Sequence, residues 1–120
     1  MIDHLNIGVS DVAASRAFYE RALAPLGYSV VMERPEGVAF GKDGKPDFWV
    51  SDRSVSGPMH IAFASPDRAT VDAFHREAVA AGGQDNGPPG LRPRYHPAYY
   101  GAFAVDPDGN NVEAVTHRPE

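Results

Sequence analysis

The sequence predicts an α+β fold made of two tandem copies of one β-α-β-β-β unit. An internal repeat is the first observation behind this prediction, since matched residues lie 56 positions apart and His60 corresponds to His4 and Phe74 to Phe18. The other two observations are a strand-like alternation at the start of each copy and a helix-capping residue that follows it in the sequence. A repeat of this length indicates one supersecondary unit present twice, neither copy able to bury a core alone.

The first copy contains the signals of all five elements. Residues 2–9 alternate in the manner of a strand. Ser10 or Asp11 can cap the helix that follows, and Gly27 is placed to end this helix in a left-handed conformation. Short strands are then expected at residues 28–32, 38–40 and 48–50.

The second copy repeats this order. A strand is expected at residues 59–64, and the segment Ser65-Pro66-Asp67 supplies a cap with proline at the first helical position. Residues 86–101 are so rich in proline and glycine that we do not expect one regular element throughout. The segment Asp106-Pro107-Asp108-Gly109 predicts a tight turn. This turn joins the last expected strands, residues 102–105 and 111–116.

Length and composition limit the organisation and the classes of function. A chain of 120 residues with 42% hydrophobic residues is expected to form a single domain, residues 1–120, with module 1 at 1–53 and module 2 at 58–120. A net charge of −5 argues against a nucleic-acid partner. The absence of cysteine excludes disulfides and thiolate chemistry. No apolar stretch approaches the ~20 residues of a membrane span, and no signal peptide is recognised, so a cytoplasmic protein without a membrane partner is expected.

Several of these features together resemble the vicinal oxygen chelate superfamily, which includes glyoxalase I, fosfomycin-resistance proteins, extradiol dioxygenases and bleomycin-resistance proteins. The resemblance rests on the two modules, the first-strand histidines, the Phe18-Tyr19 pair on the first helix, and the turn at 106–109 followed by Glu113. It covers essentially the whole chain. It implies sheets curled around a shared cleft that binds a small-molecule substrate. Members of this length usually dimerise and often build each site from both chains, so a homodimer is expected.

The resemblance also implies a metal site. Members that bind a divalent ion place ligands on the first and last strands of each module, which correspond here to His4, His60 and Glu113. Such a set suits one Fe, Mn, Ni or Zn ion with open positions for two substrate oxygens. Strand parity agrees, because each of these residues lies opposite the more apolar side of its strand. The expected function is a glyoxalase/dioxygenase-like enzyme (a lyase, isomerase, dioxygenase or transferase), with Glu113 also catalytic.

One position departs from the family pattern. Glyoxalase-type members carry a glutamate on the last strand of the first module, where this chain has Trp49. This difference argues against glyoxalase I activity itself. It keeps open a metal-free ligand-binding or drug-sequestering protein of the bleomycin-resistance type. Trp49 is then either a wall of the substrate pocket or a core residue.

Aromatic and basic side chains gather in the irregular segment before the final hairpin. They are Arg92, Arg94, Tyr95, His96, Tyr99 and Tyr100. One interpretation is a lid over the cleft, with Arg92, Tyr95 and Tyr100 binding substrate, an arginine holding an anionic group, and Tyr99 transferring a proton. The alternative is an ordered loop that its own aromatic residues pack against the sheet.

Overall fold

The structure, a computed structural model, describes residues 1–120 and confirms the predicted α+β class. Each half consists of a strand, a helix and three further strands. Module 1 contains β1 (Leu5–Gly8), α1 (Val12–Ala22), a short 3-10 helix η1 (Ala24–Leu26), β2 (Ser29–Arg34), β3 (Gly37–Lys42) and β4 (Lys45–Ser51). Module 2 contains β5 (His60–Ala64), α2 (Arg68–Ala80), β6 (Gln84–Leu91), β7 (Tyr100–Val105) and β8 (Asn111–Thr116).

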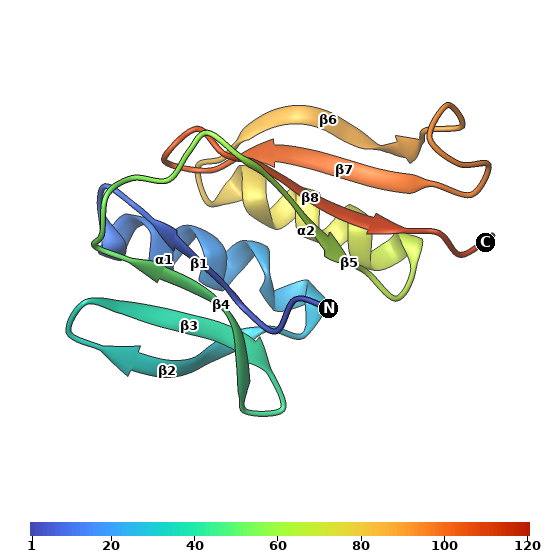
Figure 1. The fold of residues 1–120 in the computed structure, drawn as a ribbon. Helices are drawn as coiled ribbons and strands as arrows, with labels where there is room; N and C mark the ends of the chain where they lie inside the picture. Colours follow the sequence, from blue (N-terminus) through green and yellow to red (C-terminus); the bar gives the residue numbers. More distant parts are fainter.

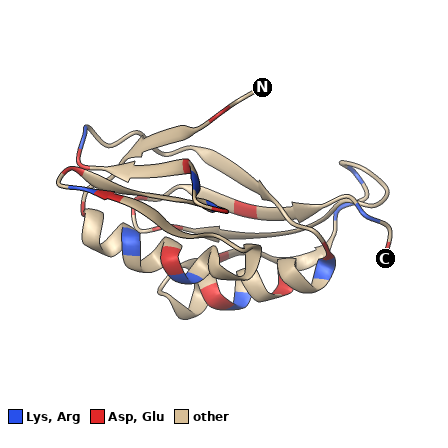
Figure 2. Ribbon diagram, turned by 90° about the horizontal axis from the view of Figure 1, so that it is seen from below, with Lys and Arg blue, Asp and Glu red and all other residues tan.

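Each module forms its own four-stranded sheet. The strand orders are β1-β4-β3-β2 and β5-β8-β7-β6, so the two sheets have the same topology. In both, the first strand of the module pairs in parallel with the last, and the remaining pairs are antiparallel. Both helices lie on the same side of the curled, open sheets (Figures 1 and 2), and their exposed surfaces carry charges of both signs. The sequence repeat is thus a repeat in three dimensions.

Both helices begin directly after an aspartate cap, Asp11 and Asp67. Two details differ from the expectation. Pro66 precedes the cap instead of occupying the first helical position, and α1 already ends at Ala22, so that Gly27 ends the short helix η1 that follows it. The Asp11 carboxylate accepts a hydrogen bond from the backbone N–H of Ala14, 3.1 Å away, and Asp67 accepts one from Thr70 at 2.8 Å. These side chains satisfy donors that the first turn of each helix leaves without an intrahelical partner. Gly27 ends η1 with φ of +86°, the left-handed conformation that glycine adopts without steric cost.

The hydrophobic core crosses the boundary between the modules. The Tyr19 ring on α1 packs edge-on against Phe48 of β4, with the ring centroids 4.9 Å apart. Phe48 in turn packs against Phe63 of module 2, at 5.3 Å. A single cluster of 19 buried hydrophobic residues includes side chains of both halves. This shared core explains why the two repeats form one folded unit.

As expected, no single element runs through residues 86–101, but the sequence did not predict strand β6, which forms at residues 84–91 despite their proline and glycine content. β6 is an edge strand that pairs only with β7, and its register shifts between Asp85 and Gly87 and again between Gly87 and Gly90. Pro88 and Pro89 lie within the second shift, where no ladder hydrogen bond is required of them. An edge position and bulges are the circumstances in which a strand tolerates proline.

The predicted turn at residues 106–109 connects the modules. Asp106 is only 5% exposed, and its carboxylate accepts hydrogen bonds from the backbone N–H groups of Asp108 at 2.9 Å and Asn110 at 2.8 Å. The Tyr19 hydroxyl of α1 also donates to this carboxylate. The turn motif therefore holds the last hairpin of module 2 against the helix of module 1.

Replacing Tyr19 by Phe should weaken this connection. The change removes a donor from the buried Asp106 carboxylate and should lower the free energy of unfolding by about 1–3 kcal/mol. Burial, and then the charge of Asp106, raise the pKa of Tyr19 well above its ordinary value. The stabilisation is therefore complete below the unfolded-state pKa of about 10 and is lost as the pH rises beyond it.

Urea unfolding at a series of pH values measures both effects. The difference in stability between the parent and Tyr19→Phe should shrink above pH ~10. Tyr95→Phe removes a hydroxyl from an exposed residue and serves as the control. A difference that stays constant or grows in alkali would contradict the assigned contact.

Candidate active site

Strand alternation places Trp49 and Glu113 on the sheet faces that point away from the helices. In β4, Phe48 and Val50 are buried in the core, so Trp49 between them lies on the opposite face. In β8, Val112 and Ala114 are core residues, so Glu113 has the opposite orientation. These faces carry the candidate site.

Three expected site residues, His60, Tyr99 and Glu113, meet in module 2. We call them the Glu113 cluster. Glu113 is fully buried, and its Oε1 lies 2.7 Å from His60 Nε2. The Tyr99 hydroxyl donates to the other carboxylate oxygen. His60 and Glu113 are far apart in sequence and meet because β5 and β8 pair in parallel, with Ala62 opposite Glu113.

Tyr99 is held as a hydrogen-bond donor in this cluster. Burial raises its pKa, and the hydrogen bond and charge of Glu113 raise the pKa further, while the nearby charge of Arg92 acts in the opposite direction. The phenol therefore stays protonated at neutral pH and fixes one oxygen of the carboxylate.

Two further residues shape the cluster and were not identified from the sequence. At Gly101, a Cβ atom would lie 3.1 Å from both Glu113 Oε2 and Tyr99 Cε1, so glycine leaves room for their contact. Phe103 lies opposite Glu113 in the register of β7 and β8, and its ring centroid is 6.0 Å from that of His60. The alternation of β7, with Ala102 and Ala104 in the core, was the signal for both residues.

The cluster borders a hollow of about 360 Å³ lined by His60, Tyr95, Tyr99 and Phe103. Tyr95 packs edge-on against Tyr99, with 5.1 Å between the ring centroids. A neighbouring hollow contains Arg92 and Arg94 and shares Tyr95 and Phe103 with the first. The expected residues Arg92, Tyr95 and Tyr99 thus line adjoining hollows.

Tyr100 requires a correction. Its hydroxyl donates to Asp72 on α2 at 2.6 Å, and the Arg68 guanidinium lies over its ring at 5.1 Å. Tyr100 therefore lies on the helix side of the sheet and lines none of the hollows around the cluster. Because Tyr100 is the first residue of β7, alternation directs it away from the face that carries Phe103.

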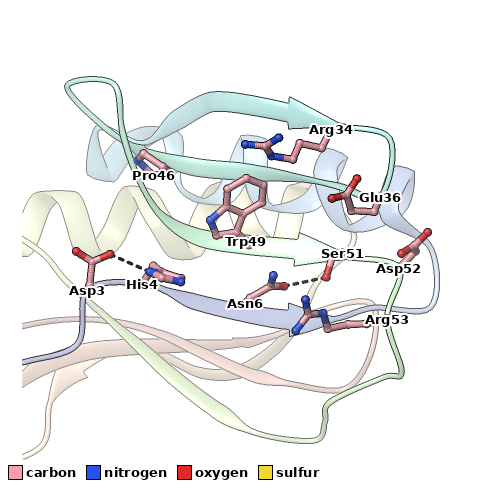
Figure 3. A pocket seen from close by; sticks show the side chains of 10 residues that line it. All are labelled: Asp3, His4, Asn6, Arg34, Glu36, Pro46, Trp49, Ser51, Asp52 and Arg53. Carbon is pink, nitrogen blue, oxygen red and sulfur yellow. Dashed lines mark hydrogen bonds and ion pairs between the residues drawn. The ribbon is translucent and has the colours of Figure 1, made fainter.

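Module 1 contains the largest hollow, of about 490 Å³ (Figure 3). Its lining is mostly polar and consists of Asp3, His4, Asn6, Arg34, Glu36, Pro46, Trp49, Ser51, Asp52 and Arg53. Trp49 forms a wall, and the Arg34 guanidinium lies over its ring at 5.9 Å. Of the two interpretations of Trp49, the structure thus favours the pocket wall over the core.

The structure does not bring His4 to the Glu113 cluster. His4 lies in the module 1 hollow, where its Nδ1 is 2.8 Å from Asp3 Oδ1. No three His, Asp or Glu side chains of the chain lie together in a way that could hold a metal ion. His60 and Glu113 converge and offer the imidazole and carboxylate donors that suit Fe, Mn, Ni or Zn. The chain thus supplies two of the three expected ligands at one place.

Comparison with known proteins identifies the family. The profile of the Glyoxalase/Bleomycin resistance protein/Dioxygenase superfamily matches residues 1–114. The chain belongs to this superfamily. The superfamily fold accounts for the repeated module, and the resemblance seen in the sequence is confirmed. None of the helices is long and apolar enough to cross a membrane.

The chain is also similar to individual proteins in sequence or in fold. A glyoxalase/bleomycin resistance protein from Albidiferax ferrireducens T118 superposes with a TM-score of 0.80 and is 27% identical over 97% of each chain. Lactoylglutathione lyase from Agrobacterium tumefaciens has the same fold, with a TM-score of 0.72 and 22% identity over 97% of this chain and 92% of its own. The uncharacterized protein YqjT of Bacillus subtilis (strain 168) is 29% identical over 93% of this chain and 95% of its own.

Proposed function

We propose that this protein is a glyoxalase/dioxygenase-like enzyme that acts on a small molecule with the help of one divalent metal ion. His60 and Glu113 of one chain would hold the ion together with His4 of the partner subunit in a homodimer. The observation that carries the proposal is the buried Glu113 carboxylate, which faces a histidine 2.7 Å away at the edge of a hollow.

The surroundings of Glu113 favour a cation as its partner. A buried carboxylate is costly unless it is paired, and this one contacts an imidazole and a phenol but no lysine or arginine. An imidazole and a carboxylate on adjacent strands are donors that Zn, Fe and related divalent metals accept. Tyr99 would act as the outer partner that orients the ligating carboxylate.

The assignment of His4 follows from the number of ligands. Two protein ligands are one fewer than the three typical of a catalytic site. Within one chain His4 lies in a separate hollow, so its contribution would require a second copy. A bound divalent metal would supply Lewis-acid polarisation of substrate oxygens. The protein would supply Phe103 and the partner's Trp49 as apolar walls of the pocket.

A metal-free ligand-binding protein of the bleomycin-resistance type is the second candidate. The module 1 hollow favours it, since Trp49 provides an aromatic wall and the polar lining is already formed within one chain. The hollow contains three carboxylates, Asp3, Glu36 and Asp52, against two arginines. This small excess of negative charge would favour a cationic ligand. Under this function, binding depends on Trp49 and is independent of His60.

Elemental analysis of protein purified without chelator tests the proposal. The parent should contain nearly one Fe, Mn, Ni or Zn ion per chain, and His60→Ala and Glu113→Gln should each lower the metal affinity by more than about tenfold. His75→Ala is the matched control, because His75 is hydrogen-bonded to Asp85 on the helix side of module 2. It should retain the full metal content.

A protein that binds no metal would decide against the proposal. A parent that takes up none of the four ions after dialysis against each would contradict the metal-dependent function. Ligand binding that is lost in Trp49→Ala and retained in His60→Ala would then support the second candidate.

A further inference from the structure

We propose that the substrate carries an oxyanion, a carboxylate or a phosphate-type group, which binds to Arg92 and Arg94 beside the Glu113 cluster. This inference rests on the proposed function in one respect: it assigns one end of the molecule whose reacting oxygens would lie at that cluster. The anion would bind in the adjoining hollow, called the basic hollow, which is lined by Asn86, Gly87, Arg92, Arg94, Tyr95, Phe103 and Asn111.

The basic hollow has a volume of about 280 Å³ and lies next to the Glu113 cluster. Two arginines, two asparagines and the rings of Tyr95 and Phe103 line it. Tyr95 and Phe103 also line the hollow that contains His60 and Tyr99, so the two spaces share a wall. A small molecule bound over Tyr95 and Phe103 would contact both hollows.

The charge of the basic hollow is not neutralised within the chain. No carboxylate lines it, and neither Arg92 nor Arg94 forms an ion pair. By contrast, several basic side chains elsewhere do form ion pairs: Arg16, Arg21, Lys45, Arg68 and Arg76. In a protein of net charge −5, two neighbouring arginines without carboxylates form a local positive site that attracts anions.

Arg92 is fixed in position before any ligand binds. Its Nη2 donates to the carbonyl of Pro88 at 2.8 Å, and its guanidinium lies over the Phe103 ring at 5.4 Å. Glycines make this placement possible, because a Cβ at Gly87 would lie 3.2 Å from Nη2 and one at Gly90 only 3.0 Å from Nη1. Most of the guanidinium N–H donors stay free for a ligand, and a preorganised fork binds an oxyanion at lower entropic cost.

Arg94 adds a second cation at the rim. Its guanidinium lies 4.9 Å from the centroid of the Tyr95 ring, and its Nη2 donates to the Tyr95 hydroxyl at 3.1 Å. Tyr95 also lines the hollow that contains His60 and Tyr99, so Arg94 brings its charge to the wall that the two hollows share.

An NMR titration of the chelator-treated, metal-free chain tests the inference. Inorganic phosphate and acetate are titrated separately at constant ionic strength, and the backbone amides of Gly87 and Gly90 and the side chain of Arg92 are followed. We expect saturable shifts at these groups. Arg92→Gln should weaken binding by about tenfold, the loss of one hydrogen-bonded charge contact.

Two further variants complete the test. Arg92→Lys keeps the charge and removes the planar fork, so it should weaken acetate binding more than phosphate binding. Arg76→Gln removes the same charge from the exposed surface of α2 and should leave both affinities unchanged. Tighter binding of phosphate would assign a phosphate-type group, and tighter binding of acetate would assign a carboxylate.

Two outcomes would overturn the inference: no saturable shift in the parent with either anion, or equal losses in Arg92→Gln and Arg76→Gln. Because the titration contains no metal, its result is independent of the elemental analysis. Anion binding without metal uptake would contradict the proposed metal-dependent function and support the anion site. Metal uptake without anion binding would support the proposed function and contradict the anion site.

Discussion

Mixing His4→Ala chains with Glu113→Ala chains should restore metal sites that neither variant has alone. If each site takes His4 from one chain and His60 with Glu113 from the other, a mixed dimer contains one intact site. That site combines His4 of the Glu113→Ala chain with the intact pair of the His4→Ala chain. Random exchange of subunits should then recover about a quarter of the parent's metal content.

A matched mixture serves as the control. His60 and Glu113 belong to the same half of the site, so mixing His60→Ala with Glu113→Ala leaves every site broken and should recover no metal. Native mass spectrometry reports whether mixed dimers have formed. Mixed dimers of the first pair without recovered metal would contradict the assignment of His4 to the partner subunit.

Most of the fold could be predicted because it depends on local signals. The capping aspartates, the left-handed Gly27 and the alternation of the strands each act within a few residues, and each copy of the repeat supports the prediction made for the other. Strand β6 was not predicted, because proline and glycine content is a local signal against a strand. Its edge position, which makes the prolines tolerable, is a property of the whole sheet.

The candidate site, too, could be predicted only in part. Parity indicated the faces of His60 and Glu113, and the parallel pairing of β5 with β8 brings these residues together. Parity gave no prediction for Tyr100, since the first residue of β7 could not be located within an irregular segment. The separation of His4 from the cluster depends on how the two modules pack, and no spacing along the chain encodes that arrangement.

Truncating Phe48 to alanine should produce the largest loss of stability. Phe48 is 1% exposed, and its ring contacts Tyr19 and Phe63 at centroid distances of 4.9 and 5.3 Å. Removing a buried phenylalanine typically costs about 3–5 kcal/mol through lost transfer energy and the cavity left behind. This amount is a large part of the roughly 5–15 kcal/mol that stabilises an ordinary domain. Urea unfolding of parent and variant measures it.

Trp49→Ala is the matched control on the same strand. It removes a larger ring from the face that opens into a hollow, so it should cost well under half as much as Phe48→Ala. Equal losses would contradict the assignment of Phe48 to the core and Trp49 to a pocket wall.

Phe48→Ala also tests whether the modules unfold together. Phe48 of module 1 packs on Phe63 of module 2, so its loss should destabilise both sheets. Fluorescence of Trp49, the single tryptophan, follows module 1, and hydrogen exchange of the β8 amides follows module 2. Both should report the same reduced stability, because a shared core makes unfolding cooperative. If β8 kept its protection while module 1 unfolded, each module would have a core of its own, and the repeat would be two independent units.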